Sequence, residues 1–452
     1  MKSFEVTDGI IDEIQQWIQE KANQKIKTKL LKAHYADIAE IIERLPQSQA
    51  VYLFKLIDSK KTADALAQVD EDTRLEIVEK LTTKEIAKEI AELETDDAAD
   101  VIGELPMERQ SRVMAEIEDG KHQEDIKELL SYDEDTAGAI MAKELIKVHL
   151  DTPITSCLSE MRSMAENVKR VHSIYVVNKN EKLLGRLSLK DLITAKENAT
   201  VKDIYIPKVD YIQDQSPIEE AIRIMRKYDL EALPVVDKYL RLLGRITIDD
   251  AIDLIAEAAE EDYLLGAGVS TPVEIHDSVF ELTKARLPWL FLGLLGGLGT
   301  VFILQGFEAI MESKPLRALF FYTPLISAMA GNVGVQSSAI IVQGLANNII
   351  RDTTLKLLLK EFGLNLINGI ALGGLVILFG YIINQELIFS LTISLSLIVV
   401  IAVAGIIGTI IPLILDKYGQ DPALATGPFI TTSNDIFSIL LFFFIAKLAL
   451  GF

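Results

Sequence analysis

The sequence predicts a multidomain membrane protein with an all-α helical repeat, a tandem α+β repeat, a connecting helix and a transmembrane domain of five α-helices. Beyond residue 286 lie five long apolar segments, and about 20 apolar residues suffice for a helix to cross a bilayer. Nearly all of the net charge of −21 precedes them, because residues 1–283 carry 36 basic and 58 acidic residues. The chain therefore divides into an acidic soluble part and an apolar membrane part.

The charge and the cysteine content exclude several classes of function. A strongly acidic soluble part repels nucleic acid and attracts cations. The single cysteine, Cys157, excludes an intramolecular disulfide framework and a cysteine-cluster metal site. The first residues have no basic-then-apolar signal pattern, so we expect the soluble part to stay in the cytoplasm, where it is made.

Residues 1–130 are predicted to form helices only, because apolar residues recur at three- and four-residue spacing. The segment ADIAEIIERLP at 36–46 returns 60 residues later as DDAADVIGELP at 96–106. Such a repeat is typical of a small solenoid of stacked helix pairs. Asp96 can cap the helix that it opens, and Asp100 shares its face one turn later, so this pair is either a metal site or a simple cap.

Residues 131–262 contain two copies of a helix–strand–strand–helix pattern. The apolar strands IYVVN at 174–178 and LPVVD at 233–237 are each followed by a polar turn and a strand that begins at a glycine. The segments GRLSLKD at 185–191 and GRITIDD at 244–250 lie 59 residues apart. This tandem repeat resembles the paired CBS domain, with copies at 131–199 and 200–262.

The resemblance to CBS domains implies a turn that can hold the ribose and phosphate of an adenine nucleotide such as ATP. The matching residues are Ser188, Lys190 and Asp191 in the first copy and Thr247 and Asp250 in the second. A hydroxyl followed three residues later by an acid is also a helix-capping arrangement. Nucleotide binding and plain capping therefore both stay open at this stage.

Acidic residues gather at the end of the second copy. Asp250 and Asp253 lie one helical turn apart and repel each other unless a cation or a basic partner lies between them. Oxygen ligands with several retained waters suit Mg²⁺.

Gly266, Gly268 and Pro272 then break the helix, and a connecting helix within 263–286 leads to the membrane. This helix is either a lever or plug at the pore or a plain connector.

The five transmembrane helices are predicted at about 287–306, 318–350, 362–385, 387–415 and 422–448. An odd number of spans puts the two termini on opposite sides of the cell membrane, and the basic residues near the spans favour a cytoplasmic N-terminus and an outer C-terminus. Asp435 is the ionisable residue in the polar run of the last span. A carboxylate at membrane depth normally faces a water-filled cavity or a partner, so we expect an ion path here.

Two of the predicted spans carry small and polar residues at mid-depth. Small residues permit close helix packing, but exposed carbonyls and amides are also typical of a hydrated path. The pore-lining candidates are Gly331, Asn332 and Gln336 in the second span and Thr432 and Asn434 in the last.

Five motifs together are similar to those of the MgtE magnesium transporters and channels: DDAAD at 96–100, SYDEDTAG at 131–138, ILQGFE at 303–308, GNVGVQSS at 331–338 and DPALATGPFITTSND at 421–435. The resemblance covers essentially the whole chain, and Ala330 departs from it, because the family commonly has a second glycine there. It implies a homodimer without enzymatic activity, embedded in the cytoplasmic membrane. The pore then lies on or near the two-fold axis, where Asp435 recognises hydrated Mg²⁺.

The resemblance also implies regulatory Mg²⁺ between the helical domain, the CBS pair and the connecting helix. The candidate ligands are Asp96, Asp100, Asp229, Asp250, Asp253, Glu261 and Asp262. Cytosolic Mg²⁺ would screen these acids and close the pore.

A transporter of Co²⁺, Mn²⁺ or Ca²⁺ is an alternative, because carboxylates discriminate weakly among hard cations. Two further alternatives are a membrane-anchored nucleotide or Mg²⁺ sensor without transport and an aspartyl protease, which needs two carboxylates sharing a proton.

Overall fold

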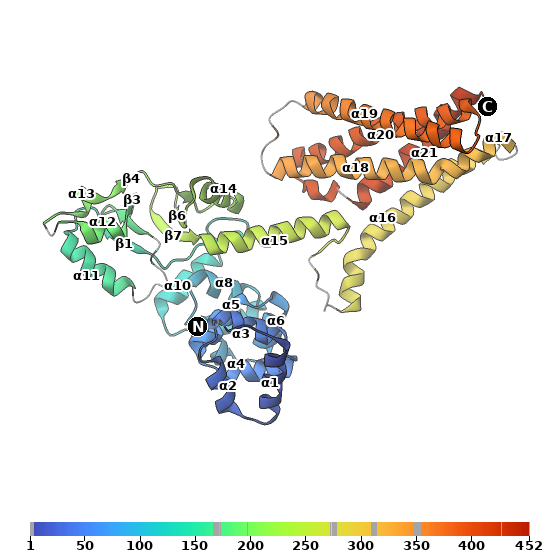
Figure 1. The fold of residues 1–452 in the computed structure, drawn as a ribbon. Helices are drawn as coiled ribbons and strands as arrows, with labels where there is room; N and C mark the ends of the chain where they lie inside the picture. The colour runs from blue at the N-terminus through green and yellow to red at the C-terminus, as the bar shows by residue number, and fades with distance from the viewer. Residues whose placement is uncertain are drawn as a thin grey trace. The chain divides into compact units, whose positions relative to one another are not determined.

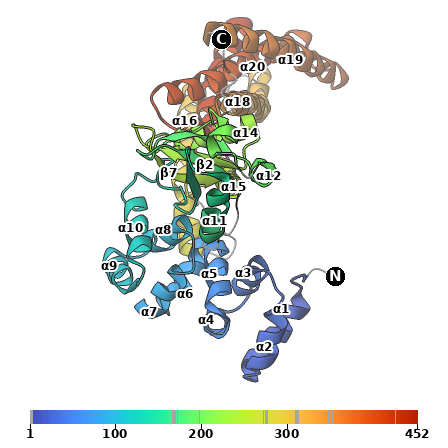
Figure 2. The ribbon, with the colours of Figure 1, turned by 90° about the vertical axis from the view of Figure 1, so that its left-hand side faces the viewer.

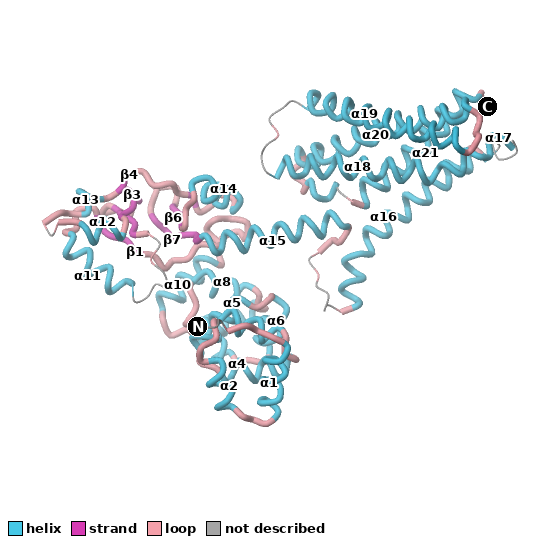
Figure 3. The backbone as a smooth tube through the Cα atoms, in the orientation of Figure 1, coloured by secondary structure: helices cyan, strands magenta, loops and turns pink. Residues whose placement is uncertain are grey.

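The structure, a computed structural model, describes residues 4–165, 171, 173–196, 198–271, 273, 278–308, 314–346, 350, 354–425 and 427–451. The chain forms two compact units, Met1–Ile255 and Ala256–Phe452. The described strands all lie in the first unit, and the described elements of the second are helices (Figures 1 and 3). This arrangement confirms the predicted fold class.

Short helices stacked on one another build the N-terminal part of the first unit (Figure 2). They are α1 (Asp8–Gln19), α2 (Asn23–Leu30), α3 (Tyr35–Glu43), α4 (Gln47–Leu56), α5 (Ser59–Gln68), α6 (Glu71–Glu79), α7 (Thr83–Ile90), α8 (Thr95–Gly103), α9 (Met107–Glu116) and α10 (Gly120–Leu129). Alternate helices pack side by side, since α3 contacts α5, α5 contacts α7 and α7 contacts α9. Pro46 and Pro106, which close the two sequence repeats, each stand at the N-cap of the following helix. The predicted helical solenoid is confirmed.

The apolar periodicity of these helices is the reason for their packing. In α3, Ile38, Ile41 and Ile42 are buried, and in α8 the equivalent positions Val101 and Ile102 are buried too. Each short helix therefore hides one face in a core shared with its neighbours, which a helix of this length needs for stability.

Two small sheets follow the helices. The first has the strand order β1-β2-β3-β4 and the second has the order β5-β6-β7. Their strands are β1 (Ile146–His149), β2 (Ile174–Val177), β3 (Leu183–Leu187), β4 (Ile206–Pro207), β5 (Ile212–Gln213), β6 (Ala232–Val236) and β7 (Leu242–Thr247), with helices α11 (Ile154–Ala165), α12 (Leu189–Thr194), α13 (Val201–Ile204) and α14 (Ile218–Tyr228) between them. The hairpins β2–β3 and β6–β7 are those predicted from the sequence, whereas the short strands β1, β4 and β5 were not predicted.

The two hairpins meet at their turns. The amide of Leu183 donates to the carbonyl of Leu240 at 2.9 Å, and the amide of Leu242 donates to the carbonyl of Glu181 at 3.0 Å. The second strands of the hairpins, β3 and β7, begin at Leu183 and Leu242, two residues before the glycines at which they were predicted to begin. A Cβ on Gly185 would lie 2.2 Å from the carbonyl oxygen of Ile206, and one on Gly244 would lie 2.7 Å from that of Ala142. These close backbone approaches explain the glycine in each repeat.

Helix α15 (Ile248–Ala267) starts directly after β7 and continues past the predicted end of the CBS repeat. The predicted acid cluster is thus on one helix, and the expected break comes at Gly268, which has a φ of +82°. The predicted connecting helix within 263–286 is divided: its first residues end α15, residues 272 and 274–277 lie outside the described part, and residues from Val279 onward belong to the first span.

The second unit contains five helices, among the described residues, that are long and apolar enough to cross a membrane. Its helices are α16 (Val279–Gly306), α17 (Lys314–Arg317), the 3-10 turn η2 (Ala318–Tyr322), α18 (Thr323–Ala346), α19 (Thr354–Ile382), α20 (Leu387–Lys417), the 3-10 turn η3 (Pro422–Ala425) and α21 (Pro428–Leu450). The predicted number of spans is confirmed. Helices α16 and α19 begin eight residues before the predicted first and third spans, because a helix continues into its polar flanks. Residues 347–349, near the end of the predicted second span, lie outside the described residues.

Candidate ion-conduction and regulatory sites

Helices α18 and α21 pack together and bring the membrane carboxylate to a partner. The Asp435 carboxylate on α21 accepts a hydrogen bond from the hydroxyl of Ser327 on α18. Asp435 is partly exposed in the single chain, so part of this residue is accessible to an ion, to water or to a second copy. Part of the polar run in α21 thus faces α18, which gives the acid the polar partner that a carboxylate at membrane depth needs.

Asn434, the neighbour of Asp435, is 1% exposed and sits in the same helix contact. Its Nδ2 donates to the carbonyl of Ala330 at 3.3 Å, and its Oδ1 has no hydrogen-bond partner among the described residues. A Cβ on Gly334 would lie 1.8 Å from Asn434 Nδ2, and a Cβ on Gly408 of α20 would lie 2.4 Å from the Gly334 carbonyl oxygen. Glycine at these positions lets α18, α20 and α21 approach closely enough for this amide to fit.

The other predicted pore-lining residues are distributed around these helices. Gly331 is buried in ordinary contact with Thr431, while Asn332 and Gln336 lie on the exposed side of α18 in the single chain. Thr432 faces α16, where its Cγ2 packs on Gly296. Gly331, Asn434 and Asp435 therefore each contact the partner helix where α18 and α21 pack, whereas Asn332, Gln336 and Thr432 lie on other faces.

A second membrane acid, Glu361, was missed because the predicted span began one residue after it. Glu361 lies in α19 and its Oε1 accepts from Ser337 Oγ of α18 at 2.5 Å and from Asn365 Nδ2 at 2.9 Å. Asn365 in turn fits against Gly405 of α20. The KEFGLN segment carried the signal, since Glu361 and Asn365 share one helix face four residues apart.

Two of the predicted regulatory acids, Asp96 and Asp250, influence each other electrostatically inside the first unit. Asp96 in the first turn of α8 is 9% exposed, and the pKa of its carboxyl lies well above the usual range. Burial is the main cause, followed by the negative charges of Asp97, Asp250, Glu94 and Glu144. Carboxylates on two helices, α8 and α15, thus repel each other, and carboxylate oxygens are the ligands that suit a hydrated Mg²⁺.

Helix capping, which was left open for both Asp96 and Asp250, accounts for Asp250 but not for Asp96. The N-cap of α8 is Glu94, so the prediction that Asp96 caps the helix is wrong; the Asp96 Oδ1 accepts instead from the amide of Asp97 at 3.0 Å. At the start of α15, the Asp250 Oδ2 accepts from the amide of Thr247 at 3.2 Å and from its hydroxyl at 2.5 Å. Thr247 and Asp250 therefore form a helix cap, one of the two readings of that turn.

The remaining predicted ligands of the first unit lie on its surface. Asp100 and Asp253 are exposed, and Asp229 is the exposed C-cap of α14 in the left-handed conformation, with a φ of 50°. Desolvation, then the charges of Asp250 and Asp249, raises the pKa of Asp253. Within the described residues, no three side chains of His, Cys, Asp or Glu are close enough to hold one metal ion, so these acids are placed as pairs and single groups.

A further pair of acids lies in the second unit. Asp262 on α15 has a raised pKa, first through desolvation and then through the charges of Asp421 and Glu261. Asp421 lies in the loop after α20, just before η3, and was not among the predicted ligands. The DPALATGP motif contained it, but sequence spacing alone does not bring a loop acid next to α15.

The turn expected to hold a nucleotide is a helix cap in the first CBS copy as well. The Ser188 Oγ accepts from the amide of Lys190 at 3.2 Å at the start of α12, and Asp191 lies partly exposed in the first turn.

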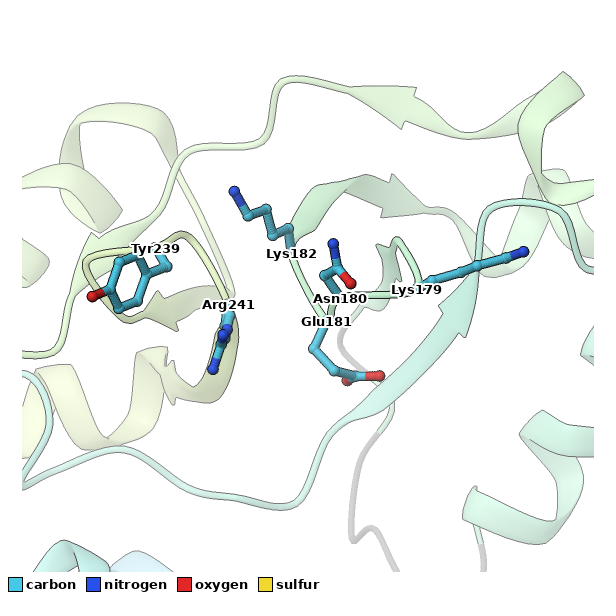
Figure 4. A pocket seen from close by; sticks show the side chains of 6 residues that line it. All are labelled: Lys179, Asn180, Glu181, Lys182, Tyr239 and Arg241. Atoms are coloured by element: carbon cyan, nitrogen blue, oxygen red, sulfur yellow. The ribbon is translucent and has the colours of Figure 1, made fainter.

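A cavity of about 590 Å³ opens where the turns of the hairpins β2–β3 and β6–β7 meet (Figure 4). Its lining residues are Lys179, Asn180, Glu181, Lys182, Tyr239 and Arg241, none of which belongs to the expected nucleotide turn.

Three family models match successive parts of the chain. The MgtE intracellular N domain matches residues 33–135, the CBS domain matches residues 137–198 and 201–257, and the divalent cation transporter model, MgtE, matches residues 323–445. The chain is 35% identical over 343 residues to the magnesium transporter MgtE of Thermus thermophilus, a match that covers 74% of each chain. It is 34% identical over 325 residues to that of Enterococcus faecalis, covering 72% of this chain and 71% of the other.

Solved structures match the soluble part. The soluble part of a magnesium transporter has a TM-score of 0.51 at 25% identity and covers 55% of this chain and 98% of its own. The cytosolic domain of the Mg²⁺ channel MgtE, solved in complex with ATP, has a TM-score of 0.51 at 29% identity and covers 54% of this chain and 99% of its own. With models for all three parts and relatives matched over most of their length, the chain belongs to the MgtE family of divalent cation transporters.

Proposed function

We propose that this protein is a homodimeric channel that lets Mg²⁺ enter the cytoplasm across the cell membrane and that cytosolic Mg²⁺ closes it. The observation that carries the proposal is Asp435, a carboxylate on a membrane-spanning helix held by Ser327 of the neighbouring helix. The names of the curated relatives, magnesium transporters, support the choice of ion.

Conduction follows from the chemistry of a hydrated divalent cation. Mg²⁺ gives up its water reluctantly, so a carboxylate can recognise it through the waters that it retains. One Asp435 from each protomer supplies two negative charges on a two-fold axis, enough to attract the ion and weak enough to release it. Apolar side chains exposed on α16 and α19, such as Phe302 and Ile367, supply surface for lipid and for the second protomer.

Regulation follows from pairs of acids that repel one another without a cation. Asp96 with Asp250, and Asp262 with Asp421, are two such pairs. Asp100 shares α8 with Asp96, Asp253 and Glu261 share α15 with Asp250 and Asp262, and Asp229 is the C-cap of α14. A cation that binds these pairs only in the closed arrangement shifts the population toward it. The functional boundaries in this proposal fall near residues 130, 199, 262 and 286.

ATP is proposed as a second ligand of the CBS pair, at Ser188, Lys190 and Asp191. The support is the ATP complex of a similar cytosolic domain. The cap formed by Ser188 leaves the exposed Lys190 ammonium and the Asp191 carboxylate for phosphate and ribose.

The test is Mg²⁺ uptake by liposomes that hold the purified protein, with the Mg²⁺ concentration on the cytoplasmic face varied. We expect flux at low cytoplasmic Mg²⁺ and a decline as it rises. Uptake of Co²⁺ and Mn²⁺ under the same conditions tests the alternative ions, since carboxylates alone distinguish them weakly. Silence toward all three ions would favour a membrane-anchored sensor.

A further inference from the structure

Two basic residues lie directly opposite each other where the turns of the two CBS hairpins meet. Lys182 precedes β3 and Arg241 precedes β7, 59 residues later, so they occupy equivalent positions in the two copies. Their backbones pair as an antiparallel bridge, whose hydrogen bonds are made by the residues on either side of each and not by Lys182 and Arg241 themselves. In such a pair the Cα atoms lie about 4.5 Å apart and the side chains share one face.

The two turns are built alike, which explains why the cations come to equivalent places. The side-chain oxygen Oδ1 of Asn178 accepts from the amide of Lys182 at 3.1 Å, and the Oδ1 of Asp237 accepts from the amide of Arg241 at 2.8 Å. The residue before each cation has a positive φ, 61° in the first turn and 65° in the second. Each turn therefore directs the chain into its second strand with a cation at the same position.

An apolar cluster holds the two turns together from the opposite face. Leu183 and Leu242 follow the two cations, and their side chains point the other way because side chains alternate along a strand. Leu242 of the second copy belongs to a buried cluster with Tyr175 and Val177 of the first, and Leu183 packs against it. The contact between the copies thus keeps two like charges opposed, although such a pair is destabilising by itself.

The positive charge of this pair is not compensated within the described part of the chain. There, neither the Lys182 ammonium nor the Arg241 guanidinium forms an ion pair with an acid, and the guanidinium lies over the Tyr239 ring, 5.6 Å from its centroid. Glu181, the acid that lines the same cavity, pairs with Lys147. The cavity is therefore positive in a soluble part whose acidic residues outnumber the basic ones by 58 to 36.

We propose that the cavity of about 590 Å³ at the hairpin turns binds a free polyphosphate, an anion with at least two phosphate groups, between Lys182 and Arg241. The planar guanidinium can donate two parallel hydrogen bonds to one phosphate, and the ammonium supplies a point charge for the next. A lipid phosphodiester, which carries a single negative charge, matches the two cations less well. The bound anion links the two CBS copies. This site is separate from the turn of Ser188 and does not rest on the proposed function.

Calorimetric titration of the full-length protein with inorganic triphosphate tests the proposal. The protein is held in phosphatidylcholine nanodiscs with EDTA, so no divalent cation is present. We expect binding by the wild type, and binding weakened about tenfold or more in Arg241→Met and in Lys182→Met, because each loses a charge-assisted hydrogen bond. Arg241→Lys should be intermediate, since lysine keeps the charge without the planar fork. A wild type that does not bind, or binding unchanged in both methionine variants, would overturn the proposal.

Lys179→Met is the matched control. Lys179 lines the same cavity and its loss changes the net charge equally, but its side chain points away from Lys182 and Arg241 (Figure 4). We expect triphosphate binding close to that of the wild type. A loss as large as in Arg241→Met would show attraction to surface charge in general and no defined site.

Lys190→Met separates this cavity from the expected nucleotide turn. It should bind triphosphate as the wild type does, because Lys190 lies at the start of α12 and does not line the cavity. Lost binding in Lys190→Met with normal binding in Arg241→Met would place the anion at that turn and refute the proposal.

Thermal unfolding gives a readout that does not depend on calorimetry. Without anion, Arg241→Met should unfold at the wild-type temperature or above, because it removes one of two opposed like charges. Triphosphate should raise the melting temperature of the wild type and leave that of Arg241→Met unchanged, since a ligand stabilises only the state that binds it. A variant that melts lower without anion would contradict the uncompensated pair.

Nanodiscs that contain phosphatidylglycerol test a lipid as the occupant. The proposal predicts that this anionic lipid changes triphosphate binding by the wild type and by Arg241→Met to the same extent. Weaker binding in the wild type alone would show that a headgroup occupies the cavity and that the free polyphosphate does not.

Discussion

The hydroxyl of Ser327 on α18 donates a hydrogen bond to the carboxylate of Asp435 on α21. This contact orients the proposed ion ligand, and Ser327→Ala removes it. We expect the Mg²⁺ concentration for half-maximal flux to rise roughly tenfold, because a hydrogen bond to a charged group contributes about 1.5 kcal/mol or more. Ser438→Ala is the control, since Ser438 donates to the backbone carbonyl of Asp435 and not to its carboxylate. Equal shifts in both variants would show that the carboxylate contact has no special role.

Close packing of α18, α20 and α21 is a second basis for prediction. Gly334→Ala would put a methyl group 1.8 Å from Asn434 Nδ2, and we expect a loss of stability of about 1–3 kcal/mol together with lost flux. Thermal unfolding in detergent and liposome flux measure the two effects. Gly374→Ala on α19 is the control, because no atom lies within 4 Å of its added Cβ. If Gly334→Ala behaves like Gly374→Ala, the three helices are not as closely packed as described.

The raised pKa of Asp96 predicts how stability depends on pH. A carboxyl whose pKa is higher in the folded state stabilises that state below its unfolded pKa, and this contribution is lost as pH rises through the folded pKa. Asp96→Asn removes the ionising group, so in EDTA near pH 7 we expect a higher melting temperature, by about 2–4 °C for each kcal/mol gained. At about pH 4 and below, where aspartate is protonated even when unfolded, the difference should vanish.

Asp100→Asn is the control for that measurement, because Asp100 is exposed on the same helix. Mg²⁺ should stabilise the wild type more than Asp96→Asn, since the variant loses a ligand. A destabilised Asp96→Asn protein at neutral pH without Mg²⁺ would mean that the buried carboxylate is compensated in a way that the structure does not contain.

Neutralising the acids of α15 should weaken closure. Asp250→Asn keeps an oxygen that can accept from Thr247 and so preserves the helix cap, while it removes the negative charge. With Asp253→Asn added, we expect flux to persist at cytoplasmic Mg²⁺ concentrations that silence the wild type. The dose–response of flux measures the change. Asp249→Asn, next to the cap on the same turn, tests whether any loss of charge there suffices.

The larger features of the fold followed from the sequence because they depend on periodicity and composition. The solenoid rests on apolar spacing such as Ile38, Ile41 and Ile42, and the hairpins rest on β-branched runs before Gly185 and Gly244. Helix ends were less predictable. The first span starts at Val279 because a capping box of Ser278 and Glu281 extends the helix beyond its apolar part.

The details of the sites depend on contacts between distant segments, which a single sequence does not reveal. A cap was one of the two interpretations of Asp96, yet Glu94 takes the N-cap position. Arg245 and Glu361 were overlooked because their hydrogen-bond partners lie on other elements. Arg245 on β7 donates to Glu94 beside α8, and Glu361 on α19 accepts from Ser337 on α18. Asp435 could be named beforehand since a charge in an apolar span is unusual by itself.

The most direct test of the central claim is Mg²⁺ uptake into liposomes with wild type beside Asp435→Asn, at low cytoplasmic Mg²⁺. The asparagine keeps the shape and the acceptor for Ser327 but removes the charge that would attract the hydrated ion. The account predicts rapid uptake by the wild type and uptake at the level of empty liposomes for the folded variant. Equal uptake by both proteins would contradict the assignment of Asp435 as the pore ligand.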